Sequence, residues 1–180
     1  TVTGTITFAG KPPALKPLAM DAEPICHKKH GAKPAPNEAL VLGNGQTMGN
    51  IIVWVSKGLP AGKTYPAPKT PVTLDQDGCQ YKPHVMGIQV GQQYRILNSD
   101  GILHNVHALS VTNPAFNFGQ PTRDPNGRYV PPMKAAEVFK IKCDVHPWMS
   151  AYVHVIDHPY FAVTGDDGAF SIPGELPDGA

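Results

Sequence analysis

The apolar residues of this chain run in short, β-rich stretches separated by turn residues, and no convincing helical period exceeds about ten residues. The 20 prolines and 18 glycines supply frequent turns, while a hydrophobic content of 41% argues against disorder. A chain of 180 residues is long enough for one well-buried core. We therefore expect an all-β sandwich in a single domain, residues 1–180.

The predicted strands alternate with ordinary turn sequences. They are expected at residues 2–8, 50–56, 71–74, 87–90, 93–98, 104–109, 137–141, 151–156 and 169–172. Residues 11–44 are rich in Pro, Lys and Ala, so we expect them to wrap the surface or to form a short helix near residues 37–42. Residues 110–136 hold five prolines among aromatic residues, which predicts a long, ordered and packed loop.

Charge and hydropathy exclude two classes of partner. The net charge is +1, and the chain contains no run of five like charges. Neither nucleic-acid binding nor a polybasic membrane patch is therefore indicated. No apolar stretch approaches the roughly 18 to 20 residues of a membrane span. The first residues lack the layout of a signal peptide and an initiator Met, which suggests a processed mature chain.

The segment from residue 139 to 149 carries the strongest chemical signal. It places Cys143, His146 and Met149 within seven residues, directly after a predicted strand. A tight loop lets three side chains converge on one point, whereas a straight strand would direct them to both faces. Thiolate and thioether sulfur with imidazole nitrogen suit copper in both oxidation states. A fourth ligand must come from elsewhere in the chain.

Two histidines upstream could supply that ligand. His104 and His107 follow the turn at residues 98–101 and lie in a predicted strand. Because side chains alternate along a strand, positions three apart face opposite sides. Only one of the two should therefore reach the metal.

These two motifs, in this order, resemble those of the cupredoxins, the blue-copper proteins. Within that family the C-x2-H-x2-M spacing and the His-Asn-Val-His run are closest to those of the amicyanins, and the likeness covers about residues 48–156. It implies a Greek-key β-sandwich with one copper ion, which has His104, Cys143 and His146 as trigonal ligands and Met149 as a weak axial ligand. It also implies that Asn105 braces the ligand loop by hydrogen bonding.

The flanks extend beyond a minimal cupredoxin. Residues 1–47 form an N-terminal extension and residues 157–180 a C-terminal one; residues 3–8 and 164–172 resemble pieces of the carboxypeptidase regulatory-like β-sandwich. We expect both extensions to add edge strands to one sandwich, in preference to forming a separate small domain.

The remaining cysteines and histidines favour structural roles. With Cys143 assigned to copper, Cys26 and Cys79 form the natural disulfide pair. The likeliest sources of a second metal site are His27, His30, His84 and His107, but a surface or hydrogen-bonded role is favoured for each, and Lys28 and Lys29 disfavour a cation near Cys26.

The resemblance implies an electron carrier. We expect a periplasmic or otherwise exported protein whose partners are redox proteins, such as a c-type cytochrome or an oxidoreductase. His146 would present an exposed imidazole edge, with Pro147 and Trp148 as a docking rim. A copper carrier or chaperone without redox turnover shares all four ligands and is the alternative. An enzyme is not expected, because multicopper oxidases and nitrite reductases need further histidine ligands and usually a second such domain.

Overall fold

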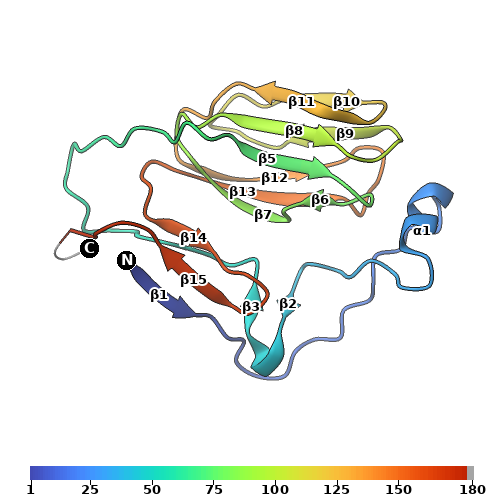
Figure 1. The fold of residues 1–180 in the computed structure, drawn as a ribbon, viewed down its shortest axis with the longest axis horizontal. Helices are drawn as coiled ribbons and strands as arrows, with labels where there is room; N and C mark the ends of the chain where they lie inside the picture. The colour runs from blue at the N-terminus through green and yellow to red at the C-terminus, as the bar shows by residue number, and fades with distance from the viewer. Residues whose placement is uncertain (178–180) are drawn as a thin grey trace.

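Two sheets packed face to face form the main body of the structure, a computed structural model that describes residues 1–177 (Figure 1). The five-stranded sheet contains, in spatial order, β10 (Asn117–Gln120), β9 (His104–Ala108), β12 (Glu137–Lys142), β13 (Ser150–Ile156) and β7 (Val85–Gln89). The four-stranded sheet contains β11 (Asp124–Val130), β8 (Tyr94–Asn98), β5 (Val72–Gln76) and β6 (Tyr81–Lys82). The predicted all-β sandwich is confirmed.

The connections cross between the layers, as in Greek-key sandwiches. The consecutive strands β8 and β9 lie in opposite sheets, and so do β10 and β11. β7 pairs in parallel with β13, and β5 with β8, while the other pairs of these sheets are antiparallel. The end of β12 pairs antiparallel with the end of β9, where Lys142 lies opposite His107, so the chain that follows β12 runs on towards His104 at the start of β9.

The core lies between the two sheets and follows the two-residue period of the strands. In β8, the buried Tyr94 and Ile96 alternate with the partly exposed Arg95 and Leu97. β9 repeats the pattern, with Val106 fully buried. Burying one such aliphatic side chain contributes roughly 1.5–3 kcal/mol, so this alternation fixes which side chains of β9 face inward.

The predicted loop over residues 110–136 is ordered, but it contains β10 and β11. Its aromatic side chains are packed: the ring of Phe116 stacks on Phe118 at 5.8 Å and meets Tyr94 edge-on at 6.4 Å. The pairing of β11 shifts register between Asp124 and Arg128, where the sequence has Pro and Gly. The bulge accommodates Pro125 and Gly127, which in the sequence indicate a break in the strand.

The terminal strands pair with one another and extend neither sandwich sheet, which corrects the expectation of added edge strands. The small sheets pair β1 (Val2–Thr5) with β15 (Ala169–Ile172), β4 (Ile52–Trp54) with β14 (Phe161–Val163), and β2 (Val41–Leu42) with β3 (Met48–Gly49). The backbone hydrogen bonds that a sandwich edge would have offered to β1 and β15 are thus supplied by these two strands to each other.

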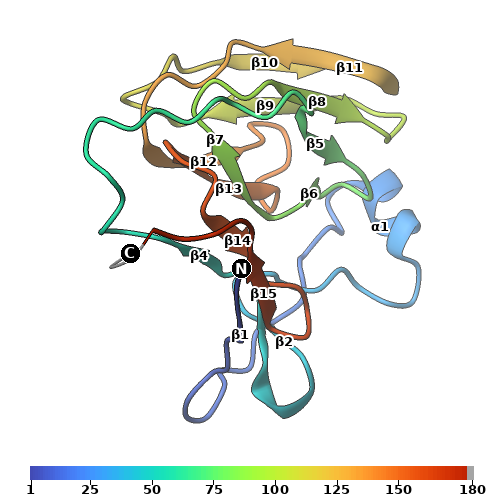
Figure 2. The same ribbon diagram turned by 60° about the vertical axis from the view of Figure 1, so that its left-hand side comes forward.

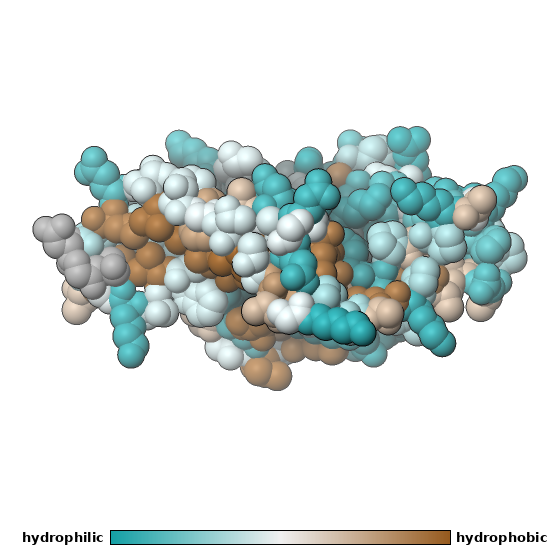
Figure 3. Space-filling model, turned by 90° about the horizontal axis from the view of Figure 1, so that it is seen from below, coloured by the Kyte–Doolittle hydropathy of each residue, from teal (hydrophilic) through white to brown (hydrophobic). Residues whose placement is uncertain are grey.

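These small sheets lie below the sandwich in Figures 1 and 2. β14 contacts it at Gly87 of β7, where a Cβ atom would come within 2.4 Å of the Phe161 ring. β3 and β4 belong to this lower part, although they fall within the predicted core of residues 48–156; residues 178–180 of the predicted C-terminal extension lie outside the described residues. Viewed from this side, hydrophobic surface gathers towards the end that holds the chain termini (Figure 3).

Among residues 1–177 the α-helix is α1 (Pro24–His30), so of the two predictions for residues 11–44 the short helix near residues 37–42 is wrong. Glu23 caps α1 by accepting a hydrogen bond from the amide of Ile25, and Pro24 suits the first turn, where its missing N–H is not needed. A single 3-10 turn occupies Asn44–Gln46. Within residues 1–177, no helix has the length and apolar character needed to cross a membrane.

Candidate metal centre

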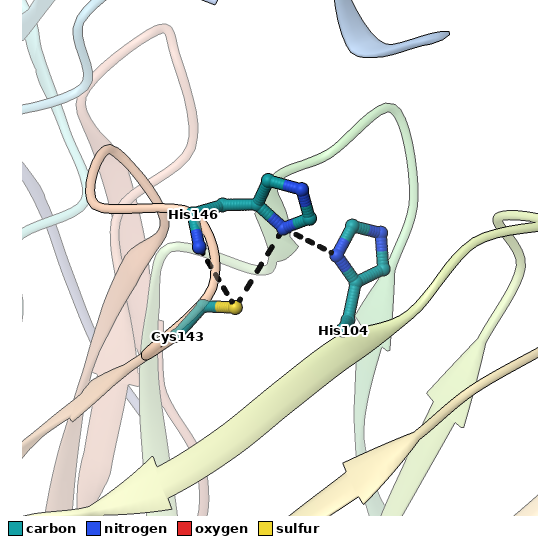
Figure 4. Close-up of side chains that lie close together, drawn as sticks. All are labelled: His104, Cys143 and His146. Atoms are coloured by element: carbon teal, nitrogen blue, oxygen red, sulfur yellow. Dashed lines mark hydrogen bonds between the residues drawn. The ribbon is translucent and has the colours of Figure 1, made fainter. Parts of the chain in front are cut away.

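Three of the predicted ligands meet at one end of the sandwich (Figure 4). His104 is the first residue of β9, Cys143 directly follows β12, and His146 lies in the loop between β12 and β13. The Nδ1 atoms of the two imidazoles are 3.0 Å apart, and the Sγ atom of Cys143 is 3.7 Å from Nδ1 of His146. All three side chains are buried, and their potential ligand atoms lie within 4.8 Å of one another.

The ligand loop is tight and is held by its own backbone. The amide of Met149 donates to the carbonyl of His146 at 3.0 Å, and the amide of Cys143 donates to the carbonyl of Met149 at 3.2 Å. Met149 is buried at this turn. These bonds keep the Cys, His and Met side chains on one short loop.

Asn105 joins the ligand loop to β9. Its Oδ1 accepts a hydrogen bond from the amide of Asp144 at 3.0 Å, and its side-chain amide donates to Asn117 Oδ1 at 2.6 Å. The loop that carries Cys143 is therefore tied to the strand that carries His104. Such outer contacts orient metal ligands.

Hydrogen bonds to sulfur favour the thiolate form of Cys143. The amides of Asn105 and His146 donate to its Sγ atom at 3.4 and 3.3 Å. Burial alone would raise the pKa of the Cys143 thiol, but these bonds, together with His104 and the amide of Val145, lower the pKa below its usual range. The thiolate is the form of cysteine that binds metal.

His104 is held through its second ring nitrogen. Its Nε2 atom lies 2.8 Å from Oδ2 of Asp100, and both side chains are fully buried. Burial lowers the pKa of His104, but the hydrogen bonds to Asp100 and Cys143, together with the negative charges of these two groups, raise the pKa overall. Because a carboxylate accepts the proton of Nε2, Nδ1 is free to face His146 and the metal position.

Asp100 is itself surrounded by donors. The amides of Gly78 and Cys79 donate to it at 3.0 and 2.7 Å, and Nζ of Lys29 lies 2.8 Å from its Oδ1. Burial would raise the pKa of Asp100, but hydrogen bonds from His104, Lys29 and the two amides lower it well below its usual value. The carboxylate is therefore ionised at neutral pH.

His146 is buried, with 3% of its surface exposed, which contradicts the expected exposed imidazole edge. Residues of the N-terminal extension lie near the ligand loop: Leu18 lines one cavity with Trp148 and Met149, and the charge of Glu23 raises the pKa of His146. Burial and the neighbouring His104 lower that pKa more strongly, so the imidazole is neutral.

Of the predicted docking rim, Pro147 is exposed but Trp148 is only partly so. The indole N–H of Trp148 donates to the carbonyl of Cys79 at 3.1 Å, and its ring lies 5.1 Å from that of His146. Trp148 is thus directed towards the disulfide between Cys26 and Cys79, the pairing predicted from the sequence.

The other histidines make separate contacts. His107 lies on the opposite face of β9, where its Nδ1 atom contacts Asp144 at 3.0 Å. His27 pairs with Asp21, while His30 and His84 contact the carbonyls of Gly78 and Ser150. Among residues 1–177, the second cluster of potential ligands is Cys79, Asp100 and His104, in which the Cys79 sulfur is already bonded to Cys26.

Sequence reasoning missed Asp100 and Lys29. In the sequence, Asp100 reads as part of the turn at residues 98–101, and Lys29 reads only as a charge near Cys26. The one available signal was the position of Asp100 four residues before His104, across a tight turn. Nothing in the sequence indicates that Lys29, more than 70 residues away from Asp100, comes within reach of it.

The donor set fits copper. Two imidazole nitrogens and a thiolate converge in a buried site, and a thioether follows on the same loop; this combination of soft and borderline ligands suits Cu(I) and Cu(II). The neutral His146 and the favoured thiolate are in the protonation states that metal binding requires.

Several solved structures are similar to this chain. A copper-containing nitrite reductase (NirK) from Thermus scotoductus SA-01 has a TM-score of 0.43 at 20% identity over 56% of this chain, which spans only 25% of the length of that protein. A mutant of amicyanin with Cu(I) has a TM-score of 0.41 at 20% identity, covering 48% of this chain and 82% of that one. A purple cupredoxin from Nitrosopumilus maritimus has a TM-score of 0.39 at 23% identity, over 47% of this chain and 98% of its own.

These neighbours are cupredoxins. No family model matches the sequence, and no curated protein matches it either. These likenesses cover about half of this chain, so the proposed function depends on the residues of the site.

Proposed function

We propose that this chain binds one copper ion through His104, Cys143, His146 and Met149 and carries single electrons between redox proteins. The observation that carries the proposal is the convergence of two Nδ1 atoms and one thiolate sulfur in a buried site. When bound, copper supplies one-electron exchange between Cu(I) and Cu(II). The role proposed is that of a carrier and not an enzyme, because the described ligands form one such centre.

The residues of the site would hold their positions through both oxidation states. Asn105 ties the ligand loop to β9, and the amides of Asn105 and His146 donate to the sulfur. A rigid ligand set limits the rearrangement that accompanies electron exchange, and hydrogen bonds to sulfur tune the potential. An exported location and a c-type cytochrome or oxidoreductase as partner belong to the same proposal.

Visible and electron paramagnetic resonance spectra of the copper-loaded protein test this proposal. We expect an intense thiolate-to-copper band in the unaltered protein and its loss in Cys143→Ser. His107→Ala is the matched control, because His107 lies on the outer face of β9, and it should keep the band. A copper-loaded protein without the band would contradict the blue-copper assignment.

The burial of His146 favours one alternative, a copper carrier that hands over Cu(I) without redox turnover. A covered imidazole offers a redox partner no direct edge for contact. A carrier should release copper readily to a competing chelator, whereas an electron carrier should retain it through repeated cycles of oxidation and reduction. Chelator competition before and after such cycling therefore separates the two roles.

A further inference from the structure

A line of charged contacts connects the N-terminal helix to the metal centre. Lys29 of α1 reaches Oδ1 of Asp100 at 2.8 Å, and Oδ2 of Asp100 lies 2.8 Å from Nε2 of His104. Asp100 and His104 are fully buried, while the Lys29 side chain retains 34% of its exposure. The helix thus brings a positive charge within two contacts of a proposed copper ligand.

The helix is firmly anchored at this position. The disulfide between Cys26 and Cys79 joins α1 to the turn between β5 and β6, and His30 contacts the carbonyl of Gly78 at 2.7 Å. The amides of Gly78 and Cys79 also donate to Asp100. The turn that anchors the helix is therefore the turn that cradles the carboxylate.

We propose that Asp100 and Lys29 are positioning residues that orient His104 and set the charge beside the metal site, so that the N-terminal helix tunes the reduction potential of the centre. The inference rests on the function proposed above. Neither residue touches the metal position; each acts through His104. The N-terminal extension is thereby a working part of the centre.

The two residues act in opposite directions. A carboxylate that accepts the Nε2 proton makes the His104 imidazole a stronger donor, which favours Cu(II) and lowers the potential. Lys29 partly offsets that negative charge, which favours Cu(I) and raises the potential. If the two residues served only to stabilise the fold, their replacement would not shift the reduction potential in opposite directions.

The test is the reduction potential of the copper-loaded full chain, measured in three variants. Asp100→Asn should raise the potential and Lys29→Gln should lower it, each by about three- to tenfold in the Cu(II)/Cu(I) equilibrium, where tenfold corresponds to about 59 mV for one electron. Lys28→Gln is the matched control, because Lys28 is the adjacent exposed lysine of α1 and makes no ion pair within residues 1–177; it should leave the potential unchanged. Shifts of the same sign in the first two variants, or no difference from Lys28→Gln, would overturn the inference.

A second measurement needs no metal. In the metal-free protein, the Nε2 proton of His104 should give a downfield NMR signal, because its acceptor is charged, and should move upfield in Asp100→Asn but not in Lys28→Gln. An unchanged signal in Asp100→Asn would show that Asp100 does not hold His104. A protein that binds no copper would overturn the proposed function and the tuning, while this signal would still decide the orientation of His104.

Discussion

Glu137, at the start of β12, organises the turn that precedes β10. Its carboxylate accepts hydrogen bonds from the hydroxyl of Ser110 at 2.6 Å and from the amides of Val111, Thr112 and Asn113 at 2.7 to 3.0 Å. Burial raises the pKa of Glu137, but these donors lower it to about 2. The bonds therefore favour the ionised carboxylate in the folded protein.

Replacing Glu137 with Gln should lower the free energy of unfolding at pH 7 by about 1–2 kcal/mol, a figure reduced for solvent screening. Because the folded-state pKa lies below the unfolded one, the stabilisation is complete above about pH 4.5 and is lost as the pH falls towards about 2. Urea unfolding across this range measures it. A difference between Glu137→Gln and the unaltered protein that persisted at pH 2 would contradict the linkage.

Tyr94 presents the opposite case, a buried polar atom without a partner. Its side chain is fully buried, and its hydroxyl has no hydrogen-bond partner among the described residues. An unpaired buried hydroxyl costs roughly 1–3 kcal/mol, so Tyr94→Phe should leave stability unchanged or raise it by about 1 kcal/mol while keeping the ring contact with Phe116. Thermal unfolding tests this, and a clear loss of stability would reveal a partner for the hydroxyl.

At the same scale, sequence reasoning anticipated which side chains meet and that Asn105 contacts the ligand loop, but it missed the residues that hold His104. The spacing of Cys143 and His146, and the alternation that separates His104 from His107, follow from local geometry. The contacts of Asp100 with Lys29 depend on tertiary packing between distant segments, which no local period reports. The burial of His146 escaped for the same reason, because it depends on tertiary packing around the ligand loop.

At the scale of elements, the disulfide is the main restraint on α1. It closes a loop with a sequence separation of 53 residues, for which the chain-entropy model predicts about 4 kcal/mol of stabilisation. The double variant Cys26→Ala/Cys79→Ala should therefore unfold at a lower urea concentration, with up to about 4 kcal/mol lost. An unchanged midpoint would mean that the packing of α1, without the covalent bond, holds the helix in place.

Each predicted strand overlaps a strand of the structure, because each carries a two-residue apolar period between turn residues. β10 and β11 were missed, since prolines and a bulge conceal their period, and β6 is only two residues long. The helix was placed too late in the chain, because Pro24 reads as a breaker although it starts α1. Pairing between the two termini could not be predicted, because strand partners are chosen by tertiary structure.

At the scale of the whole molecule, the N-terminal extension lies beside the end of the sandwich that holds the ligand loop. Cys143 is the free cysteine of the chain and is buried, so a reagent can reach its thiol only when the cover opens. The opening should involve α1 and the segment before it, because Leu18 lines a cavity with Trp148 and Met149 of the ligand loop and Lys29 of α1 pairs with Asp100. Local opening of this kind has its own free energy, below that of global unfolding.

We therefore expect Cys143 of the metal-free protein to react slowly with an aromatic disulfide reagent, and about tenfold or more faster in Cys26→Ala/Cys79→Ala. Both proteins contain one free thiol, so the absorbance change reports Cys143 alone. Glu137→Gln is the control, since it destabilises the sandwich away from α1. If it accelerated the reaction as much as loss of the disulfide, exposure would follow global unfolding and the N-terminal extension would not act as a separate cover. If only the disulfide variant reacts faster, access to the ligand loop is governed by the anchored helix, because that bond is the covalent tie between α1 and the sandwich.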